Sequence, residues 1–211
     1  MILTHGANSL ARGGEGQTVI IGGKEYPTVL MPDGNIWLGL NLDFAWNDLP
    51  VGGSGMPSTP NAWYNFNNES TWGWNGYKCG LLYNGAAISY LETNKATLIP
   101  GWHVPTNAEW DALFTAAGGT SVAGTKLKAT NDVAYPMYNE NWNGTDDYGM
   151  SILPSGYRWA SDSFVNGASN DSRYAVSDVN YYAGFSSSAS TGRWSHNSAE
   201  GIAIRLIKDA P

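Results

Sequence analysis

The segment PTNAEWDALFTAAGG, residues 105–119, carries a complete set of helix signals. Thr106 and Glu109 have the S/T-x-x-E spacing of a capping box, in which each side chain satisfies a free backbone N–H of the first turn. An apolar stripe at helical spacing follows, made of Trp110, Leu113, Phe114 and Ala117. The pair Gly118-Gly119 then supplies a stop. The pattern predicts a helix with one buried face.

Most other patterned segments are short strands joined by turns. TVII, KEYPTVLM and IWLGLNL, within residues 18–42, are separated by the turns GG and PDGN. GLLYNGAAISYLE predicts a short helix that begins near Asn84 or Gly85, and AGTKLKA predicts a short strand or turn. GIAIRLI, residues 201–207, alternates large apolar residues with Ala and Arg, as a half-buried strand requires. We expect a compact fold rich in strands, turns and loops.

Length and composition limit the architecture and the partners of the chain. Its 211 residues suffice for one domain with a real core, which we place at residues 17–211, after an arm at residues 1–16 without periodic pattern. Charged residues are 14% of the chain, the net charge is −7 and the basic residues are scattered, so no nucleic-acid partner is expected. No apolar run approaches the roughly 20 residues of a membrane span, so no membrane insertion is expected.

The N-terminal residues and the single cysteine bear on where the chain is made. MILTHGANSLARGGEGQ has no basic segment followed by an apolar core, so it does not resemble a secretion signal. Cys79 is the only cysteine and cannot form an internal disulfide. We therefore expect synthesis in the cytoplasm without a signal peptide. Cys79 has no identifiable base nearby in sequence and is better interpreted as a small apolar filler than as a reactive thiol.

Candidate catalytic and metal-binding groups are few. His103 and Glu109 lie close in sequence, but Glu109 has a capping role and a histidine before a helix commonly satisfies a backbone group. The only histidines are His5, His103 and His196, and they are far apart, so neither a metal nor a cofactor is expected. The pair Asp146-Asp147 is typical of a turn, although two carboxylates brought together in space could hydrolyse a glycoside. We expect no catalytic residues.

The composition of residues 157–197 is unusual. This stretch holds ten serines with many Asn, Asp, Ala and Tyr residues, and it contains no Lys, Glu, Gln or Met. An exposed loop region would also be rich in Ser, Asn, Asp and Gly, but it would use Lys and Glu freely. Tyr with Ser, Gly and Asn is the composition of antibody binding loops, in which Tyr gives rigid contact area and the small polar residues adapt around it. The composition favours a binding surface.

Six segments together resemble a known family. EYPTVLMPDGNIWLGLNL, GLLYNGAA, IPGWHVPTNAEWDAL, AGTKLKA, GMSILPSGYR and EGIAIRLIKD occur in the order seen in the Fibrobacter major paralogous domain, across residues 23–209. That domain is similar in turn to the C-type lectin fold of the formylglycine-generating-enzyme type. The resemblance implies an α+β fold with two helices around a small twisted antiparallel sheet and long loops. Formylglycine-generating enzymes need a cysteine pair, which this chain lacks.

The resemblance also suggests an origin for the unusual stretch. Many proteins with this fold are variable proteins of diversity-generating retroelements, in which a reverse transcriptase rewrites adenines near the 3′ end of the gene. Randomised Asn codons yield Asn, Ser, Tyr, Asp, Ala or Gly among others, but never Lys, Glu, Gln, Met or Trp. Residues 157–206 are expected to be this variable region, with Trp159 and Trp194 as fixed scaffold residues.

The main functional hypothesis is a non-enzymatic receptor-binding protein of a phage or prophage particle, an adhesin at the tail tip. Its partner would be a cell-surface protein or glycan, and a homotrimer would add avidity. The expected contact residues have the diversified composition: Ser161, Asp162, Ser163, Asn166, Asn170, Asp171, Tyr174, Ser177, Asp178, Asn180, Tyr181, Tyr182, Ser195, His196 and Asn197. The alternatives are an enzyme on the same fold, acting on carbohydrate, and a structural virion or cell-surface module.

Overall fold

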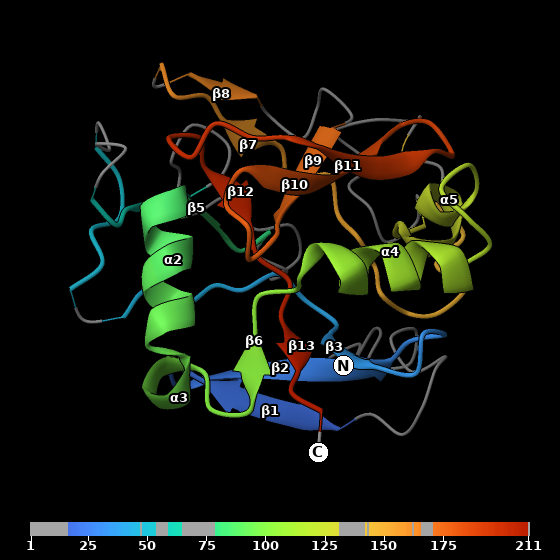
Figure 1. The fold of residues 1–211 in the computed structure, drawn as a ribbon, viewed down its shortest axis with the longest axis horizontal. Helices are drawn as coiled ribbons and strands as arrows, with labels where there is room; N and C mark the ends of the chain where they lie inside the picture. Colours follow the sequence, from blue (N-terminus) through green and yellow to red (C-terminus); the bar gives the residue numbers. More distant parts are fainter. Residues whose placement is uncertain are drawn as a thin grey trace, which may run out of the picture.

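The computed structural model describes residues 17–46, 48–53, 59–64, 79–130, 142, 144–161, 163–165 and 171–210. Two sheets form its framework, a six-stranded one at the top of Figure 1 and a five-stranded one at the bottom. The five-stranded sheet has the order β1-β2-β3-β13-β6, and the six-stranded sheet has the order β11-β10-β9-β12-β5-β4. Helices lie between and beside the two sheets (Figure 1).

The predicted N-terminal strands are confirmed. They are β1 (Thr18–Ile21), β2 (Lys24–Leu30) and β3 (Ile36–Leu38), joined as successive antiparallel pairs. The turn before β3 contains Gly34 at φ 85°, a conformation that suits glycine. β6 (Trp102–His103) and β13 (Ile207–Lys208) complete this sheet.

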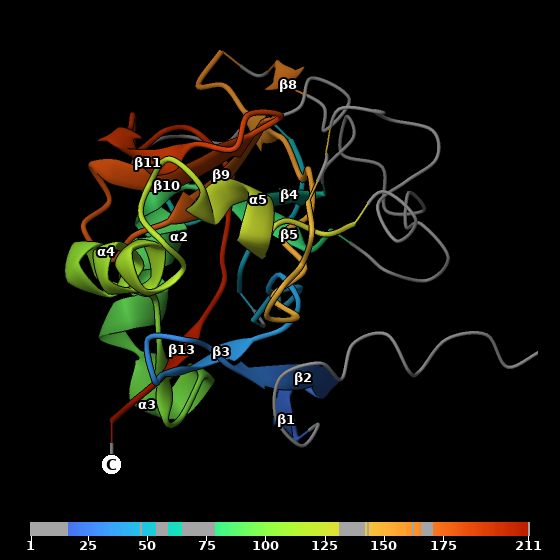
Figure 2. The same ribbon diagram turned by 90° about the vertical axis from the view of Figure 1, so that its right-hand side faces the viewer.

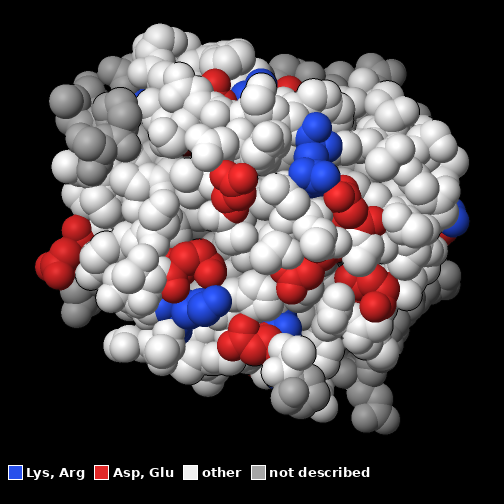
Figure 3. Space-filling view, in the orientation of Figure 1, with Lys and Arg blue, Asp and Glu red and all other residues white. Residues whose placement is uncertain are grey.

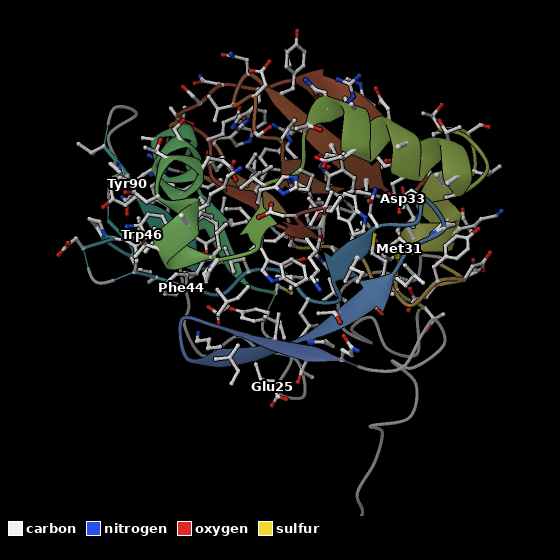
Figure 4. The ribbon with its side chains drawn as sticks, turned by 60° about the horizontal axis from the view of Figure 1, so that its bottom comes forward. Glu25, Met31, Asp33, Phe44, Trp46 and Tyr90 are labelled. Carbon is white, nitrogen blue, oxygen red and sulfur yellow. The ribbon has the colours of Figure 1, made fainter. Side chains whose placement is uncertain are left out.

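The helix α2 (Gly85–Thr93) begins where the sequence predicted. Asn84 is its N-cap and accepts a hydrogen bond from the backbone N–H of Ala87. The short α3 (Lys95–Leu98) follows it, and β4 (Ala62–Tyr64) and β5 (Leu81–Tyr83) precede it. Figure 4 shows Tyr90 of α2 beside Trp46, and the two rings stack with centroids 5.4 Å apart.

The capping-box helix is also confirmed, as α4 (Asn107–Ala116). Thr106 accepts a hydrogen bond from the backbone N–H of Glu109, and the Glu109 carboxylate accepts one from the backbone N–H of Thr106. All four residues of the predicted stripe are buried. Figure 2 shows this helix beneath the strands of the six-stranded sheet, where Trp110 packs on two aromatic rings of that sheet.

The prediction for AGTKLKA was wrong, because its first five residues form the helix α5 (Ala123–Leu127). Gly124 allows this helix to approach the turn between two later strands closely, since a Cβ on Gly124 would lie 2.6 Å from the Ala189 carbonyl oxygen. Leu127 is buried in the core with Ala123. Tertiary packing thus decides the structure of a segment too short to be assigned from its own periodicity.

Strand structure within residues 201–207 is confirmed, but the prediction of one half-buried strand was wrong. The segment divides into β12 (Ile202–Ala203), which lies in the six-stranded sheet, and β13, which lies in the five-stranded sheet. Every residue of the segment is buried, including Arg205 between the two strands. Arg205 donates hydrogen bonds to Asn41 Oδ1 at 2.8 Å and to the carbonyl oxygens of Leu38 and Met150.

The Ser- and Tyr-rich stretch forms strands. They are β7 (Tyr157–Arg158), β8 (Phe164–Val165), β9 (Asp171–Ala175), β10 (Tyr181–Ser186) and β11 (Thr191–Ser195). β10 pairs with β9 and with β11 in antiparallel register, and β9 pairs with β12 in parallel. β11 is therefore an edge strand of the six-stranded sheet, at the top of Figures 1 and 2.

The α+β class is confirmed, with few helices and mostly antiparallel strand pairs. Within the described residues there are four helices, two of them of five residues or fewer, and three sheets, whereas two helices and one small sheet were expected. The proposed arm at residues 1–16 lies outside the described residues. No helix in the described part of the chain is long and apolar enough to cross a bilayer.

Candidate functional site

Strands β9, β10 and β11 have one face packed on α4 and one face turned away from it. Tyr174, Ala183 and Phe185 point toward α4, where Trp110 lies 6.1 Å from Tyr174 and 6.1 Å from Phe185 between ring centroids. Because side chains alternate along a strand, their neighbours point to the opposite side. We call that side the outer face, formed by Asp171, Arg173, Tyr182, Gly184, Ser186, Gly192 and Trp194.

Arg173 is the centre of the outer face. Its guanidinium carbon lies 3.4 Å from the ring centroid of Tyr157, 4.6 Å from that of Tyr182 and 5.0 Å from that of Trp159. Its Nη1 donates a hydrogen bond of 2.8 Å to Glu200 Oε2. The three rings shield this ion pair from water, which strengthens both the pairing and the cation–π contacts.

His196 contacts the carboxylate of this ion pair. Its Nδ1 lies 3.2 Å from the same Glu200 oxygen, and its ring meets the Tyr182 ring edge to face. Its Nε2 and the Nε of Arg173 are buried without a hydrogen-bond partner among the described residues. Burial raises the pKa values of the Tyr157 and Tyr182 hydroxyls, with Arg173 opposing the effect. Both phenols are therefore neutral at physiological pH and can donate hydrogen bonds.

A hollow of about 170 Å³ opens on the outer face beside this cluster. It is lined by Asp171, Tyr182, Gly184, Phe185, Ser186 and Trp194. Burial raises the pKa of the Asp171 carboxyl, and the nearby Arg173 lowers it in part. The Phe185 ring points toward α4, so the hollow combines the rings of Tyr182 and Trp194 with one carboxylate and a serine.

Residues 33–208 match the model of the Fibrobacter succinogenes major domain. The chain belongs to this family. The match spans every strand from β3 to β13 and all the described helices, so the outer face lies within the family domain. Comparisons with curated proteins and with solved structures gave no match.

The Fibrobacter major domain exposes many of the predicted contact residues. Tyr181 and Ser195 are exposed cross-strand partners at the ends of β10 and β11, and Tyr182 and Asp171 are half-buried on the outer face. The other positions at least partly accessible to solvent are Ser161, Ser163, Ser177, Asp178, Asn180 and Asn197. Asp162, Asn166 and Asn170 lie outside the described residues.

Two predicted contact residues of this Fibrobacter major domain need correction. Tyr174 is fully buried because strand alternation turns it toward Trp110, and its hydroxyl donates to the Leu153 carbonyl oxygen. The His196 side chain is also fully buried, against Glu200. Neither side chain can contact a ligand without rearrangement of the core.

Sequence reasoning missed two features of the outer face in this Fibrobacter major domain. Trp159 and Trp194 were assigned to the scaffold, but they are 39% and 49% exposed and lie on the surface. Arg173 was not selected at all. The period-two spacing of Asp171 with Arg173, and of Gly192 with Trp194, would have indicated that each pair shares a face.

The other chemical candidates of the Fibrobacter major domain have structural roles. His103 lies between two carboxylates, 2.9 Å from Glu109 Oε1 and 2.6 Å from Asp209 Oδ1, and so links α4 to the end of the chain. Asp146 accepts hydrogen bonds from the backbone N–H and hydroxyl of Ser151, as a turn residue does.

The Cys79 side chain is buried. Within the described residues no three His, Cys, Asp or Glu side chains form a group that could hold a metal ion.

Proposed function

We propose that this domain is a non-enzymatic binding protein and that the outer face, with the neighbouring ends of β10 and β11, contacts its ligand. The observation that carries the proposal is the concentration of exposed aromatic side chains there. Of the exposed large apolar side chains in the described residues, Trp194 lies on the outer face, Trp159 lies beside its Arg173, and Tyr181 lies at the end of β10 on the α4 side of the sheet. Exposed aromatic groups surrounded by short polar residues are characteristic of binding surfaces.

The proposal includes diversification of this surface. The domain would be a variable protein of a diversity-generating retroelement with a C-type lectin-like fold, and residues 157–206 would be its variable region. The absence of Lys, Glu, Gln and Met from residues 157–197 supports this, as does the position of the stretch on strands that a packed core holds rigid. A rigid support limits the entropy lost when such a surface binds.

The proposed setting is the tail tip of a phage or prophage particle, with a ligand on a cell surface. The acidic net charge of −7 and the scattered charges visible in Figure 3 leave much of the viewed surface uncharged. Such a surface selects its ligand by shape, stacking and hydrogen bonds more than by long-range electrostatic attraction. A homotrimer would multiply the affinity of each site through avidity.

Two libraries displayed on yeast test this proposal. The first randomises six exposed positions within residues 157–197, each among Ser, Asn, Tyr, Asp, Ala and Gly. These positions are Ser161, Ser163, Asn180, Tyr181, Ser195 and Asn197. The control library applies the same six residue types to exposed positions of the five-stranded sheet: Thr18, Ile20, Lys24, Glu25, Leu30 and Lys208. Both are selected against hen lysozyme and against immobilised mannan as arbitrary probes.

We expect specific binders from the first library and few or none from the control library. Exposed substitutions away from special structural features change stability by only about 0.5 kcal/mol, so both libraries should remain largely folded. Equal yields of binders from the two libraries would contradict the proposal, because the region at the ends of β10 and β11 would then have no special capacity for binding.

A further inference from the structure

Trp194 lies flat over two glycines of the outer face. Gly184 and Gly192 are cross-strand partners on β10 and β11. A Cβ built on Gly184 would lie 2.7 Å from Trp194 Cζ3, and one built on Gly192 would lie 3.3 Å from Trp194 Cη2. The six-membered ring of the indole therefore occupies the space above both glycines, while 49% of the residue stays exposed.

Tyr182 extends this aromatic surface. Its ring and the Trp194 ring are stacked side by side, with centroids 5.8 Å apart and an angle of 29° between their planes. The Tyr182 ring also reaches over Gly184, 2.9 Å from the Cβ position of that residue. Rings at so small an angle form a platform, whereas a cage for a cationic group needs walls that face one another.

The polar groups beside the platform suit a neutral ligand that carries several hydroxyl groups. Asp171 and Ser186 are cross-strand partners and line the same hollow. The Asp171 carboxylate accepts hydrogen bonds, whereas the Ser186 and Tyr182 hydroxyls both donate and accept them. Arg173 is held by Glu200 behind the aromatic rings, so it offers little attraction for an anionic ligand.

We propose that this platform binds one ring of a neutral saccharide. The apolar C–H face of the sugar stacks on the exposed indole face of Trp194, and its hydroxyl groups bond with Asp171, Ser186 and the Tyr182 hydroxyl. A hollow of about 170 Å³ is well below the roughly 300 Å³ of the smallest drug-sized pockets, which fits a single ring at the end or side of a longer glycan.

This inference rests on the proposed function and assigns a ligand class to its surface. Tryptophan cannot arise from randomised Asn codons, so Trp194 would be constant among diversified relatives of this chain. A constant stacking platform would bind a chemistry that all the ligands share, and the variable residues around it would select among ligands. Mutations can therefore test the contribution of the platform to binding separately from that of the variable positions.

Binding of neutral oligosaccharides by the whole chain tests the inference. The probes are hexasaccharides of β-linked glucose, β-linked xylose and β-linked galactose, with an oligogalacturonate as the anionic counterpart, each titrated in a calorimeter. Three variants are compared with the unaltered chain: Trp194→Ala removes the platform, Gly184→Ala displaces both rings from beneath, and Tyr90→Ala removes an exposed aromatic side chain of α2 that does not line the hollow. Thermal unfolding of each variant confirms that it is folded.

We expect at least one neutral probe to bind and the oligogalacturonate to bind more weakly. Trp194→Ala and Gly184→Ala should each weaken binding by about tenfold or more, equivalent to about 1.4 kcal/mol, because each removes or displaces the ring on which the sugar stacks. Tyr90→Ala should change the affinity by less than about threefold. A neutral probe that binds equally well to the unaltered chain and to Trp194→Ala would overturn the assignment of the platform.

Failure of this inference is distinguishable from failure of the proposed function. If no saccharide binds while the exposed-position library still yields binders to lysozyme, the ligand class is wrong but the binding surface remains supported. If all saccharides fail and both libraries yield equally, both proposals are wrong.

Discussion

At the scale of single residues, two arginines show that burial, and not charge alone, decides how much an arginine contributes to the stability of the fold. Arg205 is fully buried and is held by three oxygen atoms of the core, whereas Arg193 lies at the surface with both its Nε and Nη2 donating to Asp111. The sequence presents both simply as arginines in or near strands. Their different environments follow from which sheet each strand joins, and that is a long-range property of the fold.

Replacement of Arg205 should therefore be far more damaging than replacement of Arg193. Arg205→Met leaves Asn41 and two buried carbonyl oxygens without their donor, so we expect the free energy of unfolding to fall by about 3 kcal/mol or more. Arg193→Met is the matched control and should cost about 0–1 kcal/mol, since that pair is partly exposed to water. Urea denaturation measures both values, and similar losses for the two variants would contradict this assignment.

Lys128 and Tyr26 should give the stability a maximum at alkaline pH. Burial lowers the pKa of Lys128 to about 8, so between pH 8 and its ordinary pKa near 10.5 the unfolded chain binds more protons than the native chain. The free energy of unfolding therefore rises with pH in that interval. Burial raises the pKa of Tyr26 to about 12, so above pH 10 the native chain keeps a proton that the unfolded chain loses, and stability falls.

The variant Lys128→Met isolates the first effect. The Lys128 Nζ donates to the carbonyl oxygens of Ser186 and Ser188, and the variant loses these two bonds at every pH, because a neutral amine keeps two N–H donors. We expect the difference in unfolding free energy between the unaltered chain and the variant to grow as pH rises from 8 to 10. Denaturation curves at several pH values measure it, and a difference that stays the same across this range would refute the shifted pKa.

At the scale of secondary-structure elements, the structure follows the sequence where the signals are local. The capping box, apolar stripe and glycine stop of α4 lie within fifteen residues and need no partner to be recognised. The segments at α5 and at residues 201–207 lack such local signals. α5 depends on the close approach of Gly124 to another turn, and the last segment divides between two sheets, so neither can be derived from periodicity.

The capping box of α4 gives a direct test at this scale. Thr106→Ala removes the acceptor for the backbone N–H of Glu109, and we expect it to reduce the free energy of unfolding by about 1 kcal/mol. Thr106→Ser keeps a hydroxyl at the same position and should cost little. Thermal or urea unfolding compares the two variants. An equal effect of both changes would mean that the methyl group of Thr106, rather than its hydroxyl, supports the helix.

At the scale of the whole molecule, the composition of residues 157–197 does not indicate which of its side chains reach the surface. The stretch forms β7–β11, and Tyr174 and Tyr181 both point to the α4 side of the sheet, where Tyr174 packs on Trp110 whereas Tyr181 lies at a strand end and stays exposed. The register of β9 against β10 and the position of α4 beneath them decide which tyrosine reaches the surface. Composition carries no information on either feature, so it cannot separate the exposed side chains of this stretch from the buried ones.

The DNA that flanks the gene tests the central claim, a diversified binding surface formed by residues 157–206 of this domain. Sequencing should reveal a near-copy of codons 157–206 beside a reverse-transcriptase gene, differing almost only at adenines. The differing codons should fall on exposed positions such as Tyr181 and Ser195 and should spare the buried Tyr174. The absence of such a copy, or differences spread evenly over buried and exposed codons, would contradict the claim of diversification.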